Sequence, residues 1–148
     1  SGPIMLQLLS AVELLEKYGV RSEIWSATSY GELCREAMEC ERINRLNPNS
    51  EKQISWVEQN LGVKEETTVA VSDNIAAIPG LIYPWVKGDY VILGTDGFGR
   101  SDTRESLRRF FEIDSEHIVL AALSSLIKEG KLDSKIFEEA KKDLNVEF

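Results

Sequence analysis

The stretch that decides the fold is Tyr90-Val-Ile-Leu-Gly-Thr-Asp-Gly-Phe-Gly-Arg-Ser-Asp102, in which an apolar run passes directly into a glycine-rich segment. Residues 90–94 are nearly all apolar, which is typical of a parallel strand that is buried on both faces. The glycines permit a tight turn, and Asp102-Thr-Arg-Glu105 is a capping-box pattern that opens a helix. A strand, a glycine loop and a helix in succession predict an α/β protein.

Helices and strands are predicted to alternate along the rest of the chain. Strands are expected at residues 22–27, 67–72 and 90–94. The predicted N-terminal caps of five helices are Ser29, Asp73, Asp102, Asp114 and Asp133. Apolar residues at helical spacing predict helices at residues 4–18, 29–44, 52–61, 73–78, 102–111, 116–128 and 133–144.

This alternation predicts a mostly parallel sheet with helices on both faces. A chain of 148 residues has the usual size of one domain, so residues 1–148 are expected to form a single unit. Three strands make a small sheet. We therefore expect the chain to be a fragment of a larger protein in which a further strand precedes residue 1.

Composition limits the classes of function. With 43% hydrophobic and 28% charged residues, the chain matches an ordinary soluble protein, and no membrane association is expected because no apolar run approaches roughly 20 residues. The formal net charge of −8 repels phosphate and disfavours nucleic-acid binding. Cys34 and Cys40 lie six positions apart on one predicted helix, where they cannot readily pair, which favours a cytoplasmic location.

The glycine loop is the first candidate site, because it joins a buried strand to a helix N-terminus, where backbone N–H groups can hold an anion. Its glycines are not spaced as in dinucleotide or phosphate loops, and Asp96 and Asp102 would oppose a phosphate. We favour a tight turn and keep anion binding or an interface as alternatives. The residues concerned are Thr95, Asp96, Gly97, Phe98, Gly99, Arg100 and Ser101.

Other candidate residues favour structural roles. His117 is the only histidine, and no nearby pattern supplies a nucleophile for it. The chain offers no usual ligand set for zinc or an iron–sulfur cluster. We interpret Glu36, Glu39, Glu41, Glu65 and Glu66 as members of solvated helix faces. Three aromatic residues, which belong either to a partner surface or to the core, are Trp56, Tyr83 and Trp85.

Three segments resemble the C-terminal domain of the bacterial homodimeric pyruvate dehydrogenase family. They are Ile24-Trp-Ser-Ala-Thr-Ser-Tyr-Gly-Glu-Leu33, Cys40-Glu-Arg-Ile-Asn44 and Leu93-Gly-Thr-Asp-Gly-Phe-Gly-Arg-Ser-Asp-Thr-Arg-Glu-Ser-Leu107. The segment Asp96-Gly-Phe-Gly-Arg-Ser101 is also similar to the C-terminal domain of transketolases. The resemblance implies a three-layer α/β/α domain with a mixed, mainly parallel sheet.

The resemblance further implies a parent enzyme that decarboxylates pyruvate on thiamine diphosphate and magnesium and passes the acetyl group to lipoyl groups of a dihydrolipoamide acetyltransferase core. Its implied partners are the remaining domains and the second subunit of a homodimer. The family's magnesium diphosphate motif is absent here, and Gly88-Asp-Tyr90 does not replace it. No catalytic, cofactor or metal residue is carried over, and the chain is expected to serve assembly. The alternatives are a transketolase-type domain and a small anion- or partner-binding module.

Overall fold

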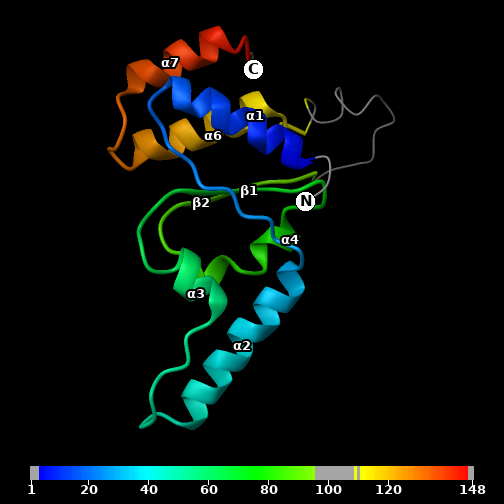
Figure 1. Cartoon of the computed structure of the whole chain (residues 1–148), viewed down its shortest axis with the longest axis vertical. Coiled ribbons are helices and arrows are strands. Elements are labelled where there is room, and N and C mark those ends of the chain that lie inside the picture. Colours follow the sequence, from blue (N-terminus) through cyan, green and yellow to red (C-terminus); the bar gives the residue numbers. More distant parts are fainter. Residues whose placement is uncertain (1–3, 96–108, 110, 147–148) are drawn as a thin grey trace.

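The computed structural model describes residues 4–95, 109 and 111–146 of the chain. Figure 1 shows three layers, in which the strands lie between one group of helices above them and another below. No helix in these described ranges combines the length and apolar character needed to cross a membrane. The elements are α1 (Ile4–Lys17), α2 (Tyr30–Leu46), α3 (Trp56–Leu61), β1 (Thr68–Val71), α4 (Ala77–Gly80), the 3-10 helix η1 (Tyr83–Trp85), β2 (Tyr90–Leu93), α6 (Ser115–Lys128) and α7 (Ser134–Asp143).

The sheet consists, in the described residues, of β1 and β2, which pair in parallel with Thr68 opposite Tyr90. These strands confirm the predictions at residues 67–72 and 90–94. The predicted strand at residues 22–27 is wrong, because this segment lies outside the sheet and links α1 to α2. Ile24 and Trp25 are adjacent apolar residues and do not follow the period of two that a strand with one buried face requires.

Two separate cores cover the two faces of the sheet, because neighbouring side chains of a strand point to opposite sides. On one face, Val69, Val71 and Leu93 pack with α1, α6 and α7. On the other, Ala70 and Ile92 pack with α2, α3 and η1. The predicted arrangement of helices on both faces of a parallel sheet is therefore confirmed.

Side-chain caps fix most of the helix starts. Ser29, Asp114 and Asp133 cap α2, α6 and α7 as predicted, each by accepting a hydrogen bond from a backbone N–H of the first turn. Such caps satisfy donors that the helix itself leaves unpaired. The predicted helix at residues 102–111 and its cap Asp102 fall largely on residues outside the described ranges.

Two helix starts differ from the predictions. Helix α3 begins at Trp56 and not near residue 52, because Ser55 forms a complete capping box there. Helix α4 begins after Ala76, which provides no side-chain cap. Asp73 was predicted as that cap, but its backbone carbonyl instead accepts a hydrogen bond from the loop after β2. The pattern of turn residues in this stretch did not reveal that tertiary contact.

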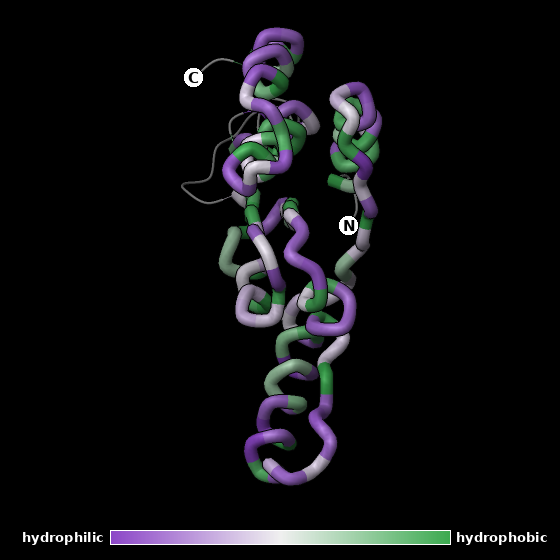
Figure 2. The backbone as a smooth tube through the Cα atoms, turned by 90° about the vertical axis from the view of Figure 1, so that its left-hand side faces the viewer, coloured by the Kyte–Doolittle hydropathy of each residue, from purple (hydrophilic) through white to green (hydrophobic). Residues whose placement is uncertain are grey.

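Helix α2 and the segment that follows it project from the body as an arm (Figures 1 and 2). Within α2, all of which is described, Ala37 is the one fully buried residue. The returning segment is held to the helix by Asn44, whose Nδ2 donates to the carbonyl of Gln53 at 2.9 Å and whose Oδ1 accepts from the Gln53 N–H at 2.7 Å. This pair of hydrogen bonds gives the arm a defined shape despite its exposure.

A polar network joins α6 to the starts of both strands. Ser125 is buried on the apolar face of α6, and its hydroxyl donates to Asp89 Oδ2 at 2.6 Å. The same hydroxyl lies 2.9 Å from Thr67 Oγ1, and Lys128 Nζ lies 3.0 Å from Asp89 Oδ2. The hydrogen bonds from Ser125 and Lys128 hold the pKa of Asp89 below its usual value. Helix α6 is thereby fixed in register over the sheet.

We expect Ser125→Ala to destabilise the fold by about 1–3 kcal/mol, because it leaves the carboxylate of Asp89 without a buried donor. Ser124→Ala removes the neighbouring exposed hydroxyl and is the matched control, with an expected effect within about 0.5 kcal/mol. The free energy of unfolding in urea measures both. Equal costs for the two variants would show that the network does not contribute to stability.

Candidate functional site

The described start of the glycine loop is built into the turn after β1. The N–H of Thr95 donates to the carbonyl of Asn74 at 3.0 Å, and its hydroxyl donates to the carbonyl of Asp73 at 2.9 Å. A Cβ on Gly94 would lie 2.7 Å from the backbone N of Ala76 and 2.8 Å from the Asn74 carbonyl oxygen. This close approach requires glycine. At Gly94 the backbone therefore passes closely against the turn after β1, and both donors of Thr95 are already used.

The remaining residues of the candidate site lie outside the described ranges: Asp96, Gly97, Phe98, Gly99, Arg100 and Ser101. The anion-binding and interface interpretations of these residues stay predictions.

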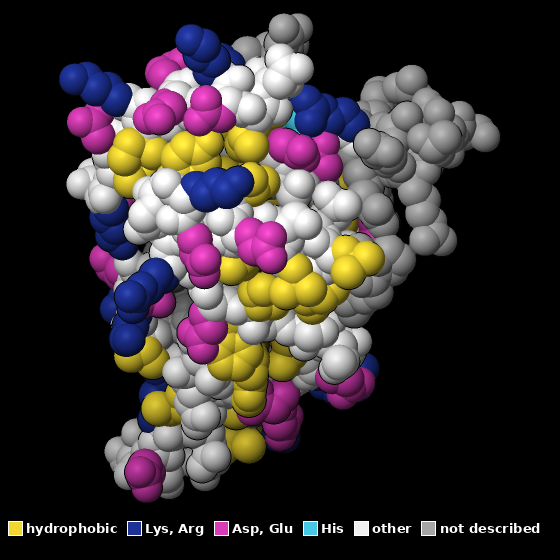
Figure 3. Space-filling view, turned by 45° about the horizontal axis from the view of Figure 1, so that its top comes forward, with side chains coloured by type: hydrophobic (Ala, Val, Ile, Leu, Met, Phe, Trp, Pro, Cys, Tyr) yellow, Lys and Arg dark blue, Asp and Glu magenta, His cyan; other side chains and the backbone are white. Residues whose placement is uncertain are grey.

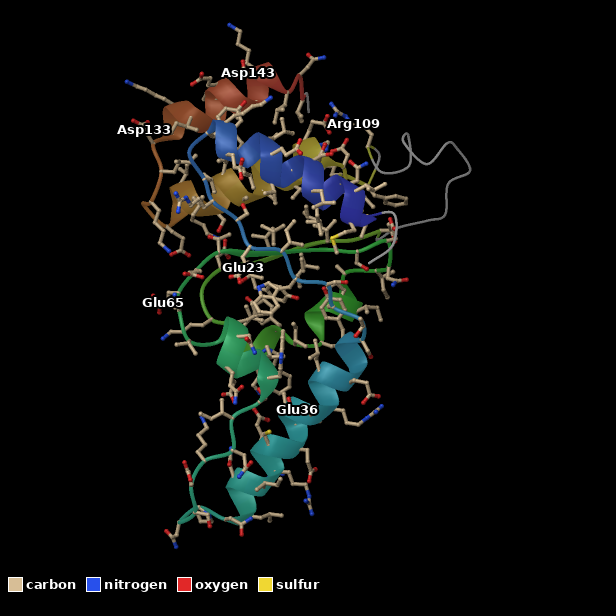
Figure 4. The ribbon with its side chains drawn as sticks, viewed as in Figure 1. Glu23, Glu36, Glu65, Arg109, Asp133 and Asp143 are labelled. Carbon is tan, nitrogen blue, oxygen red and sulfur yellow. The ribbon has the colours of Figure 1, made fainter. Side chains whose placement is uncertain are left out.

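His117 belongs to a charged cluster at the start of α6. Its Nδ1 lies 2.6 Å from Asp114 Oδ1, which also caps the helix through the His117 N–H at 3.0 Å. Arg109, labelled in Figure 4, reaches Asp114 Oδ2 at 3.3 Å and donates to the carbonyl of Asn145 at 3.1 Å. The His117 Nε2 faces the carboxylate of Glu112 at 4.0 Å. The cluster thus ties the start of α6 to the segment after α7.

The electrostatics of the cluster favour an ionised Asp114. Burial by itself would raise the pKa of this carboxyl, whose side chain is only 13% exposed. The hydrogen bonds from the side chain and backbone of His117 outweigh burial, and the nearby charges of His117 and Arg109 act in the same direction. The net result is a pKa below the ordinary value of 3.8. An aspartate held in this way stabilises structure rather than exchanging protons near neutral pH.

Carboxylates of α2 anchor neighbouring elements. Glu36, labelled in Figure 4, accepts a hydrogen bond from the N–H of Trp56 at 3.1 Å and so helps to start α3. Glu41 accepts from Trp85 Nε1 at 2.8 Å. Our prediction that both glutamates belong only to a solvated face was therefore incomplete. Glu39 fits that prediction, since it pairs along the helix with Arg42 at 3.3 Å.

The described residues contain no group of three or more His, Cys, Asp or Glu side chains that could hold a metal ion. Cys34 and Cys40 are both free, and their sulfur atoms contact Met38 and Glu36, respectively. Asp89, the acidic residue of Gly88-Asp-Tyr90, is already bonded to Ser125.

A shallow depression of about 350 Å³ lies between α7 and the end of α1. The Tyr18 hydroxyl donates there to Asp143 Oδ2 at 3.2 Å, and burial, followed by this hydrogen bond, raises the pKa of Tyr18. Figure 3 shows that basic, acidic and apolar side chains are interspersed on this face. Its mixed lining favours no particular ligand. The lining residues are Lys17, Tyr18, Ile136, Glu139 and Asp143.

Comparison with known proteins agrees with this arrangement of two helical layers over a parallel sheet. Residues 1–114 match the family model described as the transketolase-like TK C-terminal domain. The chain belongs to the transketolase-like C-terminal domain family. The predicted resemblance and fold class are confirmed.

Several curated relatives of this transketolase-like domain bear the name pyruvate dehydrogenase E1 component. The protein from Cupriavidus necator is 42% identical over 148 residues, which cover 99% of this chain and 16% of that protein. The protein from Escherichia coli K12 is 39% identical over 149 residues, with coverage of 99% and 17%. The protein from Corynebacterium glutamicum is 44% identical over 141 residues, with coverage of 95% and 15%. The chain thus spans about a sixth of the length of these relatives.

Sequence reasoning missed the residues that fix α6 in this transketolase-like domain. One signal was available, since Ser125 falls at helical spacing with the apolar residues Ile118 and Ala122 and so had to be buried. Its partners Thr67 and Asp89 are 58 and 36 positions away. Only the tertiary structure brings them together.

We expect Gly94→Ala to destabilise the transketolase-like domain by about 1–3 kcal/mol, because the added methyl group meets backbone atoms that cannot move aside. Gly31→Ala is the control, since its Cβ would meet only Ser29 Oγ at 3.8 Å; on an exposed helix it should stabilise by about 0.5 kcal/mol. Urea unfolding measures both. A Gly94→Ala variant as stable as the parent chain would refute the steric requirement.

We expect Asp114→Asn to cost about 1.5–3 kcal/mol at pH 7, because it keeps a capping oxygen but removes the charge beside His117 and Arg109. A lowered folded-state pKa contributes stability that is present above pH 3.8 and is lost as the pH falls further. The stability gap between Asp114→Asn and the parent should therefore narrow below about pH 4.

The matched control is Asp133→Asn, at the exposed cap of α7, which should change stability by less than about 0.5 kcal/mol. Urea unfolding at pH values from about 3 to 7 measures both variants. The lower limit is about one unit below the usual carboxyl pKa. A stability difference between Asp114→Asn and the parent that does not change with pH would contradict the lowered pKa of Asp114 in the folded state.

Proposed function

We propose that this chain is the C-terminal assembly and dimerisation domain of a pyruvate dehydrogenase E1 component. The observation that carries the proposal is the identity of about 40% with E1 components across 95–99% of the chain. Identity that extends over both cores and the last helices supports a shared domain rather than a shared motif. The parent enzyme would decarboxylate pyruvate oxidatively and transfer the acetyl group to lipoyl groups.

The construction of the domain supports an assembly role. Charged and polar groups of the chain join one element to another, as in Asp89 with Ser125 and Glu41 with Trp85. At the same time, large apolar side chains stay at the surface, among them Leu6 at 67% exposure and Trp25 at 45%. Surfaces of this kind serve association more readily than chemistry.

The proposal places thiamine diphosphate and magnesium in other domains of the parent enzyme, where they would supply the carbanion chemistry of decarboxylation. It rests on the ligand sets available here, because the described residues form no cluster of metal ligands. Acidic residues such as Glu36 and Glu41 are hydrogen-bonded to neighbouring elements. This chain's part would be to hold the cofactor-binding domains together.

The proposed partners are the remaining domains of the same enzyme, the second subunit of a homodimer and, through the parent, the dihydrolipoamide acetyltransferase core. The proposed location is the cytoplasm, in keeping with two cysteines that both stay free. The net charge of −8 gives no support for a nucleic-acid partner.

A transketolase-type parent is the second candidate, because the matching family carries that description. It predicts the same fold with a different substrate. Assays of the complete enzyme with pyruvate and with ketose phosphates as alternative donors separate the two. Turnover of ketose phosphates without turnover of pyruvate would replace the first proposal by the second.

We expect the 148-residue chain to show a thermal shift below about 1 °C with millimolar thiamine diphosphate and magnesium, because a ligand raises the melting temperature only of a fold that binds it. Removal of these residues from the complete enzyme should abolish both the dimer and pyruvate oxidation. Light scattering and a dye-reduction assay measure the two effects. A shift of several degrees, or a truncated enzyme that stays dimeric and active, would contradict the proposal.

A further inference from the structure

Two tryptophans form an exposed aromatic pair between the α1–α2 link and α3. The rings of Trp25 and Trp56 meet edge to face, with centroids 5.4 Å apart and an interplanar angle of 86°. Trp25 is 45% exposed and Trp56 is 39% exposed, and Ile54, two positions before Trp56, is 50% exposed. The three side chains are called the Trp25–Trp56 surface below. Large apolar residues that are exposed close together are typical of association sites.

The pair contributes little to the domain's own cores. Neither tryptophan belongs to the two core clusters of the described residues. The third tryptophan, Trp85, shows the contrast, because it is 8% exposed and its Nε1 donates to Glu41. From the sequence, Trp56, Tyr83 and Trp85 belong either to the core or to a partner surface. The structure buries Trp85 and leaves Trp56 at the surface.

Several contacts hold Trp56 in place without covering its ring. The Trp56 N–H is fixed by the carboxylate of Glu36 at 3.1 Å, and Ser55 forms a complete capping box before it. The preceding residues are fixed by the double hydrogen bond between Asn44 and Gln53. These contacts fix the backbone at Trp56, and the edge-to-face contact with Trp25 orients the ring; a side chain that is already oriented loses little conformational entropy when a partner covers it. The surface is therefore pre-organised for binding.

The length of the relatives supports one kind of partner for the Trp25–Trp56 surface. This chain corresponds to 15–17% of the length of the E1 components it matches, so most of such a polypeptide lies outside these residues. A neighbour within the same enzyme is present at a high effective concentration, so it can cover an apolar surface that would otherwise be exposed to water.

We infer that the Trp25–Trp56 surface docks this domain on the remaining domains of the same enzyme. The inference rests on the proposed function and names the surface through which assembly occurs. Tryptophan is enriched among the residues that dominate interface energetics, and such residues are sealed from water by their surroundings. In the assembled enzyme both rings are therefore covered, although they are exposed in the domain alone.

Hydroxyl-radical footprinting of the complete, active enzyme tests this directly. Trp85 is the internal reference, because it is buried within the domain itself. We expect Trp25 and Trp56 to be oxidised within about two-fold of the rate of Trp85, since interface hot spots exclude water. Oxidation of either ring about five-fold faster than Trp85, as exposure to solvent predicts, would overturn the inference.

A variant of the complete enzyme provides the second measurement. The double substitution Trp25→Ala and Trp56→Ala should accelerate proteolytic release of the domain by about ten-fold or more, as expected on loss of a hot spot. Val63→Ala is the matched control, because Val63 is 64% exposed and follows α3 closely; its release rate should change by less than about two-fold. Circular dichroism of both variants checks the fold, and the conservative Trp56→Phe should restore most of the protection.

The outcomes separate this inference from the proposed function. If the domain is needed for the dimer but both rings oxidise freely, the proposed function holds and the docking surface lies elsewhere. If a truncated enzyme lacking the domain stays dimeric and active, the proposed function fails as well. Protection of both rings in a self-associated 148-residue chain would assign the surface to a second copy and overturn the inference.

Discussion

Because β1 and β2 run parallel, their side chains alternate between two apolar cores, and each helix must cover one face or the other. Val71 and Leu93 face the core formed with α1, α6 and α7, whereas Ala70 and Ile92 face the core formed with α2, α3 and η1. A parallel pair exposed on either face would leave apolar side chains in water. The three layers follow from this requirement.

The sheet also explains why several polar residues have a structural role. Helix α6 passes over the sheet with Ser125 on its buried face, and a buried hydroxyl must find partners. Asp89 and Thr67, at the starts of the two strands, provide them. At the other end of α6, Asp114 meets His117 and Arg109 in the same way. Residues that could in principle perform acid–base chemistry thus serve to place one helix.

The exposed apolar side chains lie mainly on the side of the sheet that α2, α3 and η1 cover. Helix α2 buries only Ala37 fully, yet its arm is held in shape by Asn44 and its glutamates reach neighbouring helices. An ordered but poorly covered element of this kind fits a domain that belongs to a larger assembly. Family membership and the limited share of the relatives' length lead to the same view.

The sequence by itself determined the elements with local signals: amphipathic helices, caps such as Ser29, Asp114 and Asp133, and the apolar strand before Gly94. These signals depend on near neighbours, so they survive without knowledge of the fold. Local signals failed at residues 22–27, where strand pairing decides the outcome, and at Asp73, whose carbonyl accepts a hydrogen bond from the distant Thr95 hydroxyl. Only the tertiary structure decided that Asp89 meets Ser125, that Gly94 passes against Ala76 and that Trp25 meets Trp56, because these contacts join residues 18 to 36 positions apart.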